Sequence, residues 1–410
     1  MKSLNPENPV QDKETMSEWK EYKLGGTCEI ITGFAFKGDE YESSGNLKVV
    51  RGENVTIGKL RWDSEKHWNK PTDGLAKYFL SEFDIVIGMD GSRVGQNRAI
   101  IRREELPLIL AQRVARLRAT NGFNQKFLWY HIFSNYFKEY VEAIHTGTSI
   151  PHISQFQIAD FDILAPSLPE QTAIAEVLSS LDDKIDLLHR QNKTLEQLAE
   201  TLFRQWFVEG KWNGSLSECI KIQNGYAFMS KDFKENGYAG VIKIKNISMG
   251  SIDITNHDCV DKSVVENIDK KFKIKTGDFL IAMTGAEIGK IGIVEKTDKE
   301  IWLNQRVGKI EAKVPYGDLI GYLALKSREG QEHITNACAG SAQENISSTG
   351  IEEMAFASYN EQKVNGLGIQ IQPLFQKIIF NKGQIRTLTQ LRDSLLPKLM
   401  SGEVSFSNIS

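Results

Sequence analysis

The sequence lacks the features that mark a secreted, membrane-bound or metal-carrying protein. Its four cysteines lie far apart without a CxxC pair, which predicts reduced thiols and neither a disulfide framework nor a zinc site. No apolar run approaches the roughly 18 residues that cross a bilayer. Residues 1–18 form a polar leader without an apolar signal core. We therefore expect a cytoplasmic protein with no membrane partner.

Motifs for catalysis are also missing. An amino-methyltransferase needs an Asn/Asp-Pro-Pro-aromatic motif and a glycine-rich cofactor turn, and the sequence has neither. Gly285–Lys290 approaches a P-loop, but Ile291 follows the lysine where Ser or Thr is required. The seven histidines are scattered, and Glu311-Ala312-Lys313 is too short to identify a nuclease. We predict no catalytic residue, no metal site and no cofactor in this chain.

Charge is nearly balanced, with a formal net charge of −3. Net charge is a poor guide to nucleic-acid binding, because binding depends on where the basic residues lie. One segment is rich in arginine and contains only Glu104 and Glu105 as acidic residues; its arginines are Arg93, Arg98, Arg102, Arg103, Arg113, Arg116 and Arg118. This segment is interpreted either as a solvated strand face or as a surface for DNA.

What the sequence does contain is an internal repeat. Gly33 and Gly225 begin similar aromatic motifs 192 residues apart, and Gln112-Arg113 returns as Gln305-Arg306 after 193 residues. Solenoid repeats are shorter, with periods of roughly 20–50 residues. Each copy is long enough to form a domain. Short apolar runs between Gly-Ser-Asn turns predict strands, followed by helical stretches at about 125–144 and 318–335.

The repeat predicts an α+β fold with two tandem β-rich domains separated by two long helices. The expected order is a polar leader (1–18), a first domain (19–168), a first helix (169–210), a second domain (211–358) and a second helix (359–410).

Both helices show the apolar spacing of a coiled coil. From Ile174 and again from Leu367, apolar residues follow at alternating steps of four and three. Asn192 is the sixth of ten layers and Asn381 the fifth, so an antiparallel, pseudo-twofold pair brings them face to face. Facing amides satisfy each other and fix the register at some cost in stability. The alternative is that each asparagine merely tolerates a partly exposed position.

The same pairing sets Arg392 against Leu181, where its aliphatic stem packs and we expect its guanidinium to reach solvent. At 1.5 Å per residue, residues 174–206 span about 48 Å. The helical pair could therefore act as a ruler between two domains that touch one duplex.

Several motifs together resemble the specificity subunits of type I restriction-modification systems. They are Gly33–Lys37, Asp84–Gly91, Gln112–Val114, Pro169–Gln171, Leu202–Phe207 and Leu395–Glu403. The resemblance implies two target-recognition domains, each reading half of a bipartite, asymmetric site in double-stranded DNA. It implies that the helices set the spacing and dock two methyltransferase subunits, with restriction subunits joined through them. S-adenosylmethionine, ATP and Mg would belong to those partners. Tyr359–Gln362 departs from the pattern by lacking the proline.

Candidate DNA contacts lie in matching loops of the two copies. Base readout needs side chains such as Arg, Lys, Asn and Gln, whereas phosphate contacts only position the protein. The first copy offers Lys37, Ser92, Arg93, Gln96, Asn97, Arg98, Arg113, Thr148, Ser149 and His152. The second offers Lys231, Thr284, Glu287, Lys290, Arg306, Ser341, Gln343 and Asn345.

Other interpretations of these residues stay open. The loops can be plain turns or connectors, and Arg113 and Arg306 can be shared scaffold or phosphate contacts. The aromatic rings after Gly33 and Gly225 are expected in the core. Two other functions also remain: the specificity component of a system with a fused methyltransferase-nuclease partner, and a protein scaffold that does not bind DNA.

Overall fold

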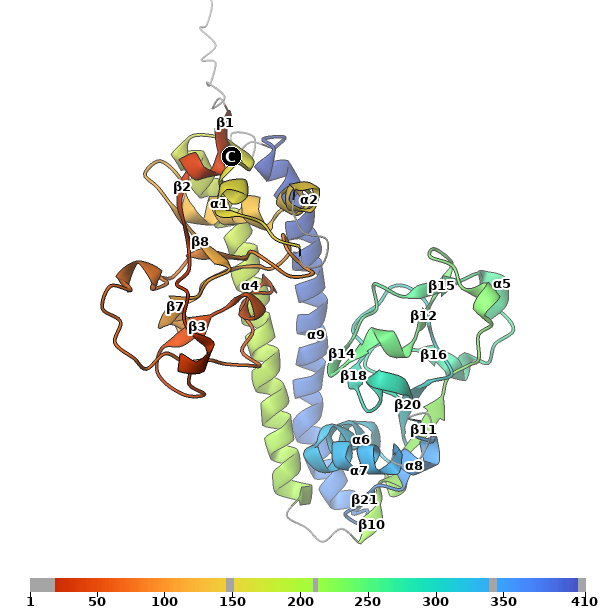
Figure 1. The fold of residues 1–410 in the computed structure, drawn as a ribbon. Coiled ribbons are helices and arrows are strands. Elements are labelled where there is room, and N and C mark those ends of the chain that lie inside the picture. The colour runs from red at the N-terminus through yellow and green to blue at the C-terminus, as the bar shows by residue number, and fades with distance from the viewer. Residues whose placement is uncertain (1–18, 145–150, 209–212, 339–344, 405–410) are drawn as a thin grey trace, which may run out of the picture. The chain divides into compact units, whose positions relative to one another are not determined.

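The computed structural model describes residues 19–144, 151–208, 213–338 and 345–404, so the expected leader lies outside the described residues (Figure 1). The chain divides into two compact units, Met1–Asp183 with Gln390–Ser410, and Lys184–Thr389. Each unit contains one β-rich domain and a part of each long helix. The boundaries between the two units fall inside the long helices.

The first domain is built on a five-stranded sheet of order β2-β8-β5-β6-β4, with a separate parallel pair β3-β7. β1 pairs antiparallel with β9, so the beginning and end of the domain meet. The strands are β1 (Lys20–Lys23), β2 (Cys28–Thr32), β3 (Lys48–Val50), β4 (Ile57–Gly58), β5 (Ile85–Gly88), β6 (Arg98–Ile100), β7 (Leu108–Leu110), β8 (Val114–Ala119) and β9 (Asp162–Ala165), and the helices are α1 (Gln125–Phe133), α2 (Asn135–Ile144) and α3 (Gln155–Ala159).

The second domain repeats this plan with a six-stranded sheet, β11-β20-β17-β18-β14-β13, and a four-stranded sheet, β15-β12-β19-β16. Its first and last strands, β10 and β21, also pair. The strands are β10 (Gly214–Ser215), β11 (Ile220–Asn224), β12 (Ala239–Ile242), β13 (Ile247–Ser248), β14 (Gly250–Ile252), β15 (Asp258–Val260), β16 (Lys273–Ile274), β17 (Phe279–Ala282), β18 (Ile291–Ile293), β19 (Ile301–Leu303), β20 (Val307–Ala312) and β21 (Ala355–Phe356). The helices are α5 (Lys262–Val265), α6 (Gly317–Lys326), α7 (Arg328–Cys338) and α8 (Ser348–Glu352).

Each expected helical stretch is two helices, because a serine with extended backbone ends the first one. Ser134 separates α1 from α2, and Ser327 separates α6 from α7. Both hydroxyls donate at 2.7 Å to a carbonyl three residues earlier, on His131 and Ala324. Competition of this kind from a serine side chain is typical of helix ends.

The long helices are α4 (Leu168–Phe203), followed by a π-helical turn (Arg204–Val208), and α9 (Glu361–Met400). Ile174 and Leu178 of α4 and Leu399 of α9 belong to the buried core of the first domain. Phe203 of α4 and Ile371 of α9 belong to that of the second. A β-rich layer buries its apolar face against another element, and here the helices provide it.

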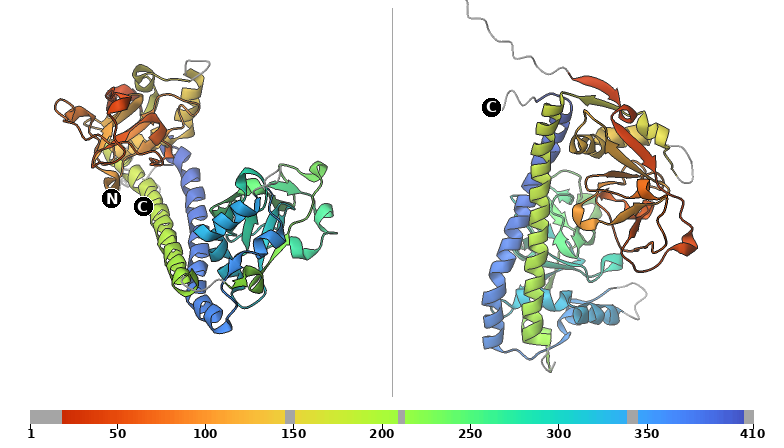
Figure 2. Two further views of the ribbon diagram at one scale, coloured as in Figure 1. Left: turned by 60° about the horizontal axis from the view of Figure 1, so that its bottom comes forward. Right: turned by 90° about the vertical axis from the view of Figure 1, so that its left-hand side faces the viewer.

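Within the second unit α4 and α9 run antiparallel, because Asn192 meets Asn381 while Trp206 lies against Gly366. Figure 2 shows the two helices side by side. The amide Nδ2 of Asn381 donates to Oδ1 of Asn192 at 2.9 Å, and Asn381 is fully buried. The prediction of a facing asparagine pair is confirmed.

The environment of Arg392 differs from the expectation. Its Nη1 donates to Oδ1 of Asp182 at 2.8 Å, and its guanidinium lies 5.4 Å from the centre of the Phe133 ring. The side chain is only 16% exposed, so the expected solvated guanidinium is wrong. The reason is a carboxylate within reach, which also accepts from the hydroxyl of Tyr130 at 2.8 Å.

Candidate nucleic-acid interface

Four main-chain segments lie side by side at one edge of the first domain's sheet, where β2 and β5 end and β8 begins. Gln112 N–H donates to the carbonyl of Phe34 at 2.8 Å. Met89 N–H donates to the carbonyl of Arg113, and Ile153 N–H to that of Met89, both at 2.9 Å. We call these segments, with residues 90–98 that follow Met89, the first loop edge. The two loops that carry most predicted contacts are thus brought together, with a bridge between Asp90 and His152.

The second domain has the same arrangement, the second loop edge. Gln305 N–H donates to the carbonyl of Tyr226 at 2.8 Å. Met283 N–H donates to Arg306 at 3.1 Å, Ile346 N–H donates to Met283 at 3.0 Å, and Thr284 bridges Asn345. Residues 284–290 complete this edge. The two domains therefore differ in sequence at this edge but share the same arrangement of main-chain segments, which we call the frame.

Most described candidates lie on or near these edges with accessible side chains. Exposed residues are Lys37, Ser92, Arg93, Arg113 and His152 in the first domain, and Lys231, Arg306 and Asn345 in the second. Gln96, Asn97, Thr284, Glu287 and Lys290 are half-buried. Thr148, Ser149, Ser341 and Gln343 lie outside the described residues.

Some half-buried candidates already have a partner. Glu287 and Lys290 form an ion pair with each other, and Gln96 Nε2 donates to Oε1 of Glu142 at 3.4 Å. Thr284 has a buried hydroxyl without a hydrogen-bond partner among the described residues.

Arg98 is a structural residue and not an accessible DNA contact. It is 4% exposed, and Nη2 donates to the carbonyls of Phe133 at 2.8 Å and Ser134 at 3.1 Å, with Nη1 bonded to Gly95. Burial lowers the pKa of its guanidinium to about 10. Arg98 therefore fastens the loop to the junction of α1 and α2, and the prediction that it binds DNA does not fit this position.

Arg113 remains accessible but is held by a carboxylate. Its side chain is 67% exposed, and Nη1 lies 2.9 Å from Oδ2 of Asp90. Its backbone is left-handed, with φ of 65°, which is uncommon for a residue with a side chain. In the second domain Thr284 replaces Asp90, and no ion pair to Arg306 is found among the described residues. The two edges therefore present different charge.

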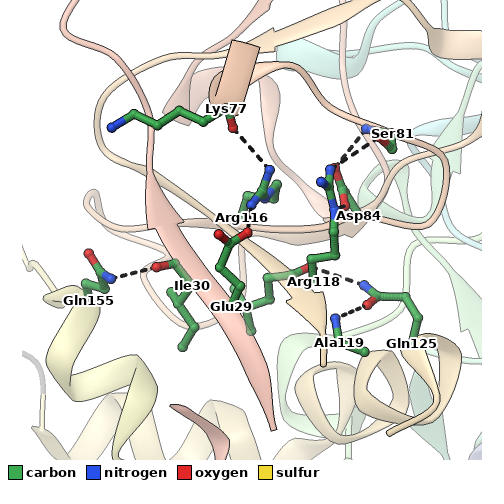
Figure 3. A network of polar contacts seen from close by, with 11 residues as sticks. Glu29, Ile30, Lys77, Ser81, Asp84, Arg116, Arg118, Ala119, Gln125 and Gln155 are labelled. Carbon is green, nitrogen blue, oxygen red and sulfur yellow. Dashed lines mark hydrogen bonds and ion pairs between the residues drawn. The ribbon is translucent and has the colours of Figure 1, made fainter. Parts of the chain in front are cut away.

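Both arginines of β8 pair with carboxylates of the same domain, as Figure 3 shows. Arg116 is buried, pairs with Glu29 and donates to the carbonyl of Lys77 at 3.1 Å. Burial lowers its pKa. Arg118 donates from Nε to Oδ1 of Asp84 at 2.8 Å, a hydrogen bond that raises its pKa. The interpretation of this segment as a solvated strand face is wrong for Arg98 and Arg116.

The aromatic motifs divide into a buried ring and an accessible one. Phe36 and Phe228 are 5% and 7% exposed, as expected for core residues. Phe34 and Tyr226 are 36% and 37% exposed, so the expectation of buried rings is wrong for these two. The backbone of each is bound to the neighbouring Gln-Arg segment, which leaves the ring at the border of the loop edge.

Sequence reasoning missed two short 3-10 helices that contribute to this border. They are Ala76–Tyr78 in the first domain and Lys270–Phe272 in the second. Each contains a lysine followed by an aromatic residue, and the two pairs lie 194 residues apart. That separation matches the repeat and could have identified them.

In the described parts of the chain, no three His, Cys, Asp or Glu side chains come together as a metal site. None of the helices in those parts is long and apolar enough to span a bilayer.

Comparison with known proteins accounts for the duplicated frame. The sequence profile of the family described as type I restriction modification DNA specificity domain matches residues 16–197 and again 209–386. The chain belongs to this family. Its two domains are DNA specificity domains, so the role of the chain is DNA recognition and not catalysis.

Related proteins can be aligned with most of this sequence. The type I restriction enzyme MjaIX specificity subunit of Methanocaldococcus jannaschii is 24% identical over 320 residues, covering 73% of each chain. The HindI specificity subunit of Haemophilus influenzae is 21% identical, covering 95% of this chain and all of that protein. The crystal structure of a type I system S subunit from M. genitalium shares the fold, with a TM-score of 0.61 at 17% identity over 95% of this chain and 97% of that one.

Proposed function

We propose that this chain is the specificity subunit of a type I restriction-modification complex that acts on DNA in the cytoplasm. Each loop edge reads one half of a bipartite, asymmetric site. The observation that carries the proposal is the shared main-chain frame with different side chains at its tips. Base-reading side chains must differ wherever the two half-sites differ, while the frame that presents them can stay the same.

The tips of the two frames differ at equivalent positions. Arg93 corresponds to Glu287 and Gln96 to Lys290, each pair 194 residues apart. Arginine binds guanine in the major groove, and glutamate accepts from cytosine, so these residues favour different bases.

The dimensions of the frame suit a groove of DNA. Neighbouring segments of a sheet lie about 4.8 Å apart, so four segments span roughly 14 Å. The major groove is about 12 Å wide. A loop projecting from one edge could therefore enter the groove while the outer segments contact its walls.

The long helices offer surfaces for the catalytic partners. Leu187 and Leu198 of α4 are 40% and 46% exposed, and Ile369 and Phe380 of α9 are 62% and 57% exposed. Each pair is eleven residues apart, which places both members on one face of a helix. Exposed apolar side chains that belong to a contiguous patch mark protein interfaces. They support docking of two methyltransferase subunits, which would bind S-adenosylmethionine, and restriction subunits that use ATP and Mg.

Mapping methylated adenines tests the proposal. The chain is co-expressed with its methyltransferase partner, and methylation is read across the host DNA. We expect one bipartite motif. Arg93→Ala should relax the sequence in one half-site only, and Glu287→Ala in the other. Lys20→Ala, an exposed residue of β1, serves as the control and should leave the motif unchanged.

Binding by the assembled complex that ignores both sequence and salt would contradict the proposal. That result would favour a protein scaffold, because DNA recognition through charged contacts weakens as salt rises.

A further inference from the structure

Each domain carries a half-exposed aromatic pair with a lysine beside it, which we call the aromatic platform. In the first domain the Phe34 and Tyr78 ring centres are 5.5 Å apart, and Lys77 Nζ lies 5.0 Å from the Tyr78 ring. In the second, Tyr226 and Phe272 are 5.7 Å apart, and Lys271 Nζ lies 5.0 Å from the Phe272 ring. The geometry is thus repeated nearly unchanged.

In each platform a second basic residue holds the lysine in place through a hydrogen bond to the lysine's main-chain carbonyl. Arg116 donates to the carbonyl of Lys77 at 3.1 Å, and Lys309, at the equivalent position, donates to that of Lys271 at 3.2 Å. In Figure 3 the Lys77 side chain extends away from Arg116 while its carbonyl points toward it. This cation therefore fixes the backbone of the platform lysine, whose side chain is exposed in both domains.

Each platform is continuous with a loop edge. The backbone of Phe34 is bonded to Gln112, and that of Tyr226 to Gln305, at 2.8 Å in both domains. The half-exposed rings therefore border the surface that the proposed duplex occupies.

We infer that each platform holds the sugar-phosphate backbone of the duplex that the neighbouring loop edge reads. This inference rests on the proposed function. The two platforms share their chemistry while the loop tips differ, so they fit the part of DNA that both half-sites share. The accessible ammonium group is complementary to a phosphate, and the aromatic rings offer an apolar surface to the deoxyribose beside it.

The two lysines differ in one respect. Lys271 Nζ lies 3.5 Å from Oδ2 of Asp269, whereas Lys77 has no ion-pair partner among the residues that the structure describes. Part of the charge of Lys271 is already balanced. The loss of Lys77 should therefore weaken DNA binding more than the loss of Lys271.

Lys77→Gln and Lys271→Gln test the inference in the complex with its methyltransferase partner. Binding is measured by titration against salt on the target duplex and on a scrambled duplex. For Lys77→Gln we expect affinity to fall about three- to tenfold on both duplexes. The negative slope of log affinity against log salt should become shallower by about 0.9, because one phosphate contact is lost. Lys20→Gln, which removes the same charge from β1, should change neither.

The rings are tested separately with Phe34→Leu and Tyr226→Leu, which keep an apolar side chain. Affinity should fall on both duplexes while the salt slope stays the same, because no charge is lost. Thermal unfolding of the free chain shows whether the fold is retained.

Unchanged affinity and slope in Lys77→Gln would overturn the inference. So would a loss confined to the target duplex, because that would make Lys77 a base-reading residue. If the parent complex does not prefer the target duplex, it is the proposed function that fails. If the parent prefers it and Lys77→Gln binds as the parent does, only the platform is wrong.

Discussion

At the scale of single residues, one carboxylate controls the charge of the first loop edge. Asp90 is half-buried and holds Arg113, whereas Thr284 at the equivalent position leaves Arg306 without that partner. An arginine paired with a carboxylate is less available to a phosphate than a free one. In the proposed interface Asp90 therefore competes with DNA phosphates for Arg113.

Asp90→Asn should therefore strengthen binding to every duplex. The released Arg113 can contact a phosphate, so we expect the salt slope to steepen by about 0.9 and affinity at low salt to rise several-fold. Titrations of the assembled complex on target and scrambled duplexes measure both. Asp73→Asn removes the same charge from an exposed position and should raise affinity less, without the full change in slope. Equal effects from both variants would show that Arg113 is not released.

His131 gives the first domain a pH dependence. It is buried, its Nε2 donates to the carbonyl of Leu164 at 2.9 Å, and burial lowers its pKa to about 4. Below the ordinary histidine pKa of about 6.5 the unfolded chain takes up a proton that the folded chain does not, so stability falls as pH falls. Between pH 7.5 and 5 this loss should be about 2 kcal/mol.

Urea unfolding at the two pH values measures the effect. His131→Gln keeps a donor for Leu164 but does not titrate, and its stability should change less with pH by that amount. If variant and parent show the same pH dependence, His131 is not the group responsible.

At the scale of elements, the asparagine pair determines how the helices meet. Asn381 is fully buried and its amide donates only to Asn192, while its own oxygen lacks a partner among the described residues. Removing Asn192 leaves a buried amide with no hydrogen-bond partner among the residues that the structure describes. Such a group destabilises the fold by about 1–3 kcal/mol.

Asn192→Leu alone should therefore lower the free energy of unfolding by about 1–3 kcal/mol. The double variant Asn192→Leu/Asn381→Leu should recover that stability or exceed it, since both amides are replaced by packed leucines, but with a less defined register. Thermal unfolding of the four proteins in the cycle measures the coupling. Strictly additive losses would show that the two amides act independently.

The helical pair could be predicted from the sequence because coiled-coil register depends on a local, regular spacing. The duplicated domains were predictable for a similar reason, since the repeat can be read directly. The position of Arg98 could not be predicted, because its partners are carbonyls of Phe133 and Ser134, about 35 residues further along the chain. The carboxylate that meets Arg392 is 210 residues away and was missed for the same reason.

The loop edges could be predicted from the sequence only in part. Matching loops in the two copies indicated which segments carry the contacts. Their meeting depends on main-chain hydrogen bonds such as that from Ile153 to Met89, which no local pattern encodes. Tertiary hydrogen bonding therefore decides which predicted residues are accessible.

At the scale of the whole molecule, both recognition domains build their cores on the same two helices. A change of helix length should therefore alter the spacing of the half-sites. Inserting one heptad after Asp183 and another after Thr389 lengthens both helices by about 10 Å while keeping the seam in phase. We expect the gap between half-sites in the methylation map to grow by about three base pairs.

An insertion in one helix only is the matched control. It shifts Asp182 out of register with Arg392, which contact each other at 2.8 Å in the parent, and should reduce stability and methylation together. An unchanged gap after the paired insertion would contradict the role of the helices as a ruler.

The pairing of β1 with β9, and of β10 with β21, has a consequence for how such proteins diversify. In each specificity domain the first and last strands pair, so the domain begins and ends at adjacent points. Genetic exchange of the stretch between those points would bring in a new set of reading loops while the residues at the junction stay as they were. A host could thus acquire a new methylation pattern through one recombination event, without altering the enzyme subunits that act on it.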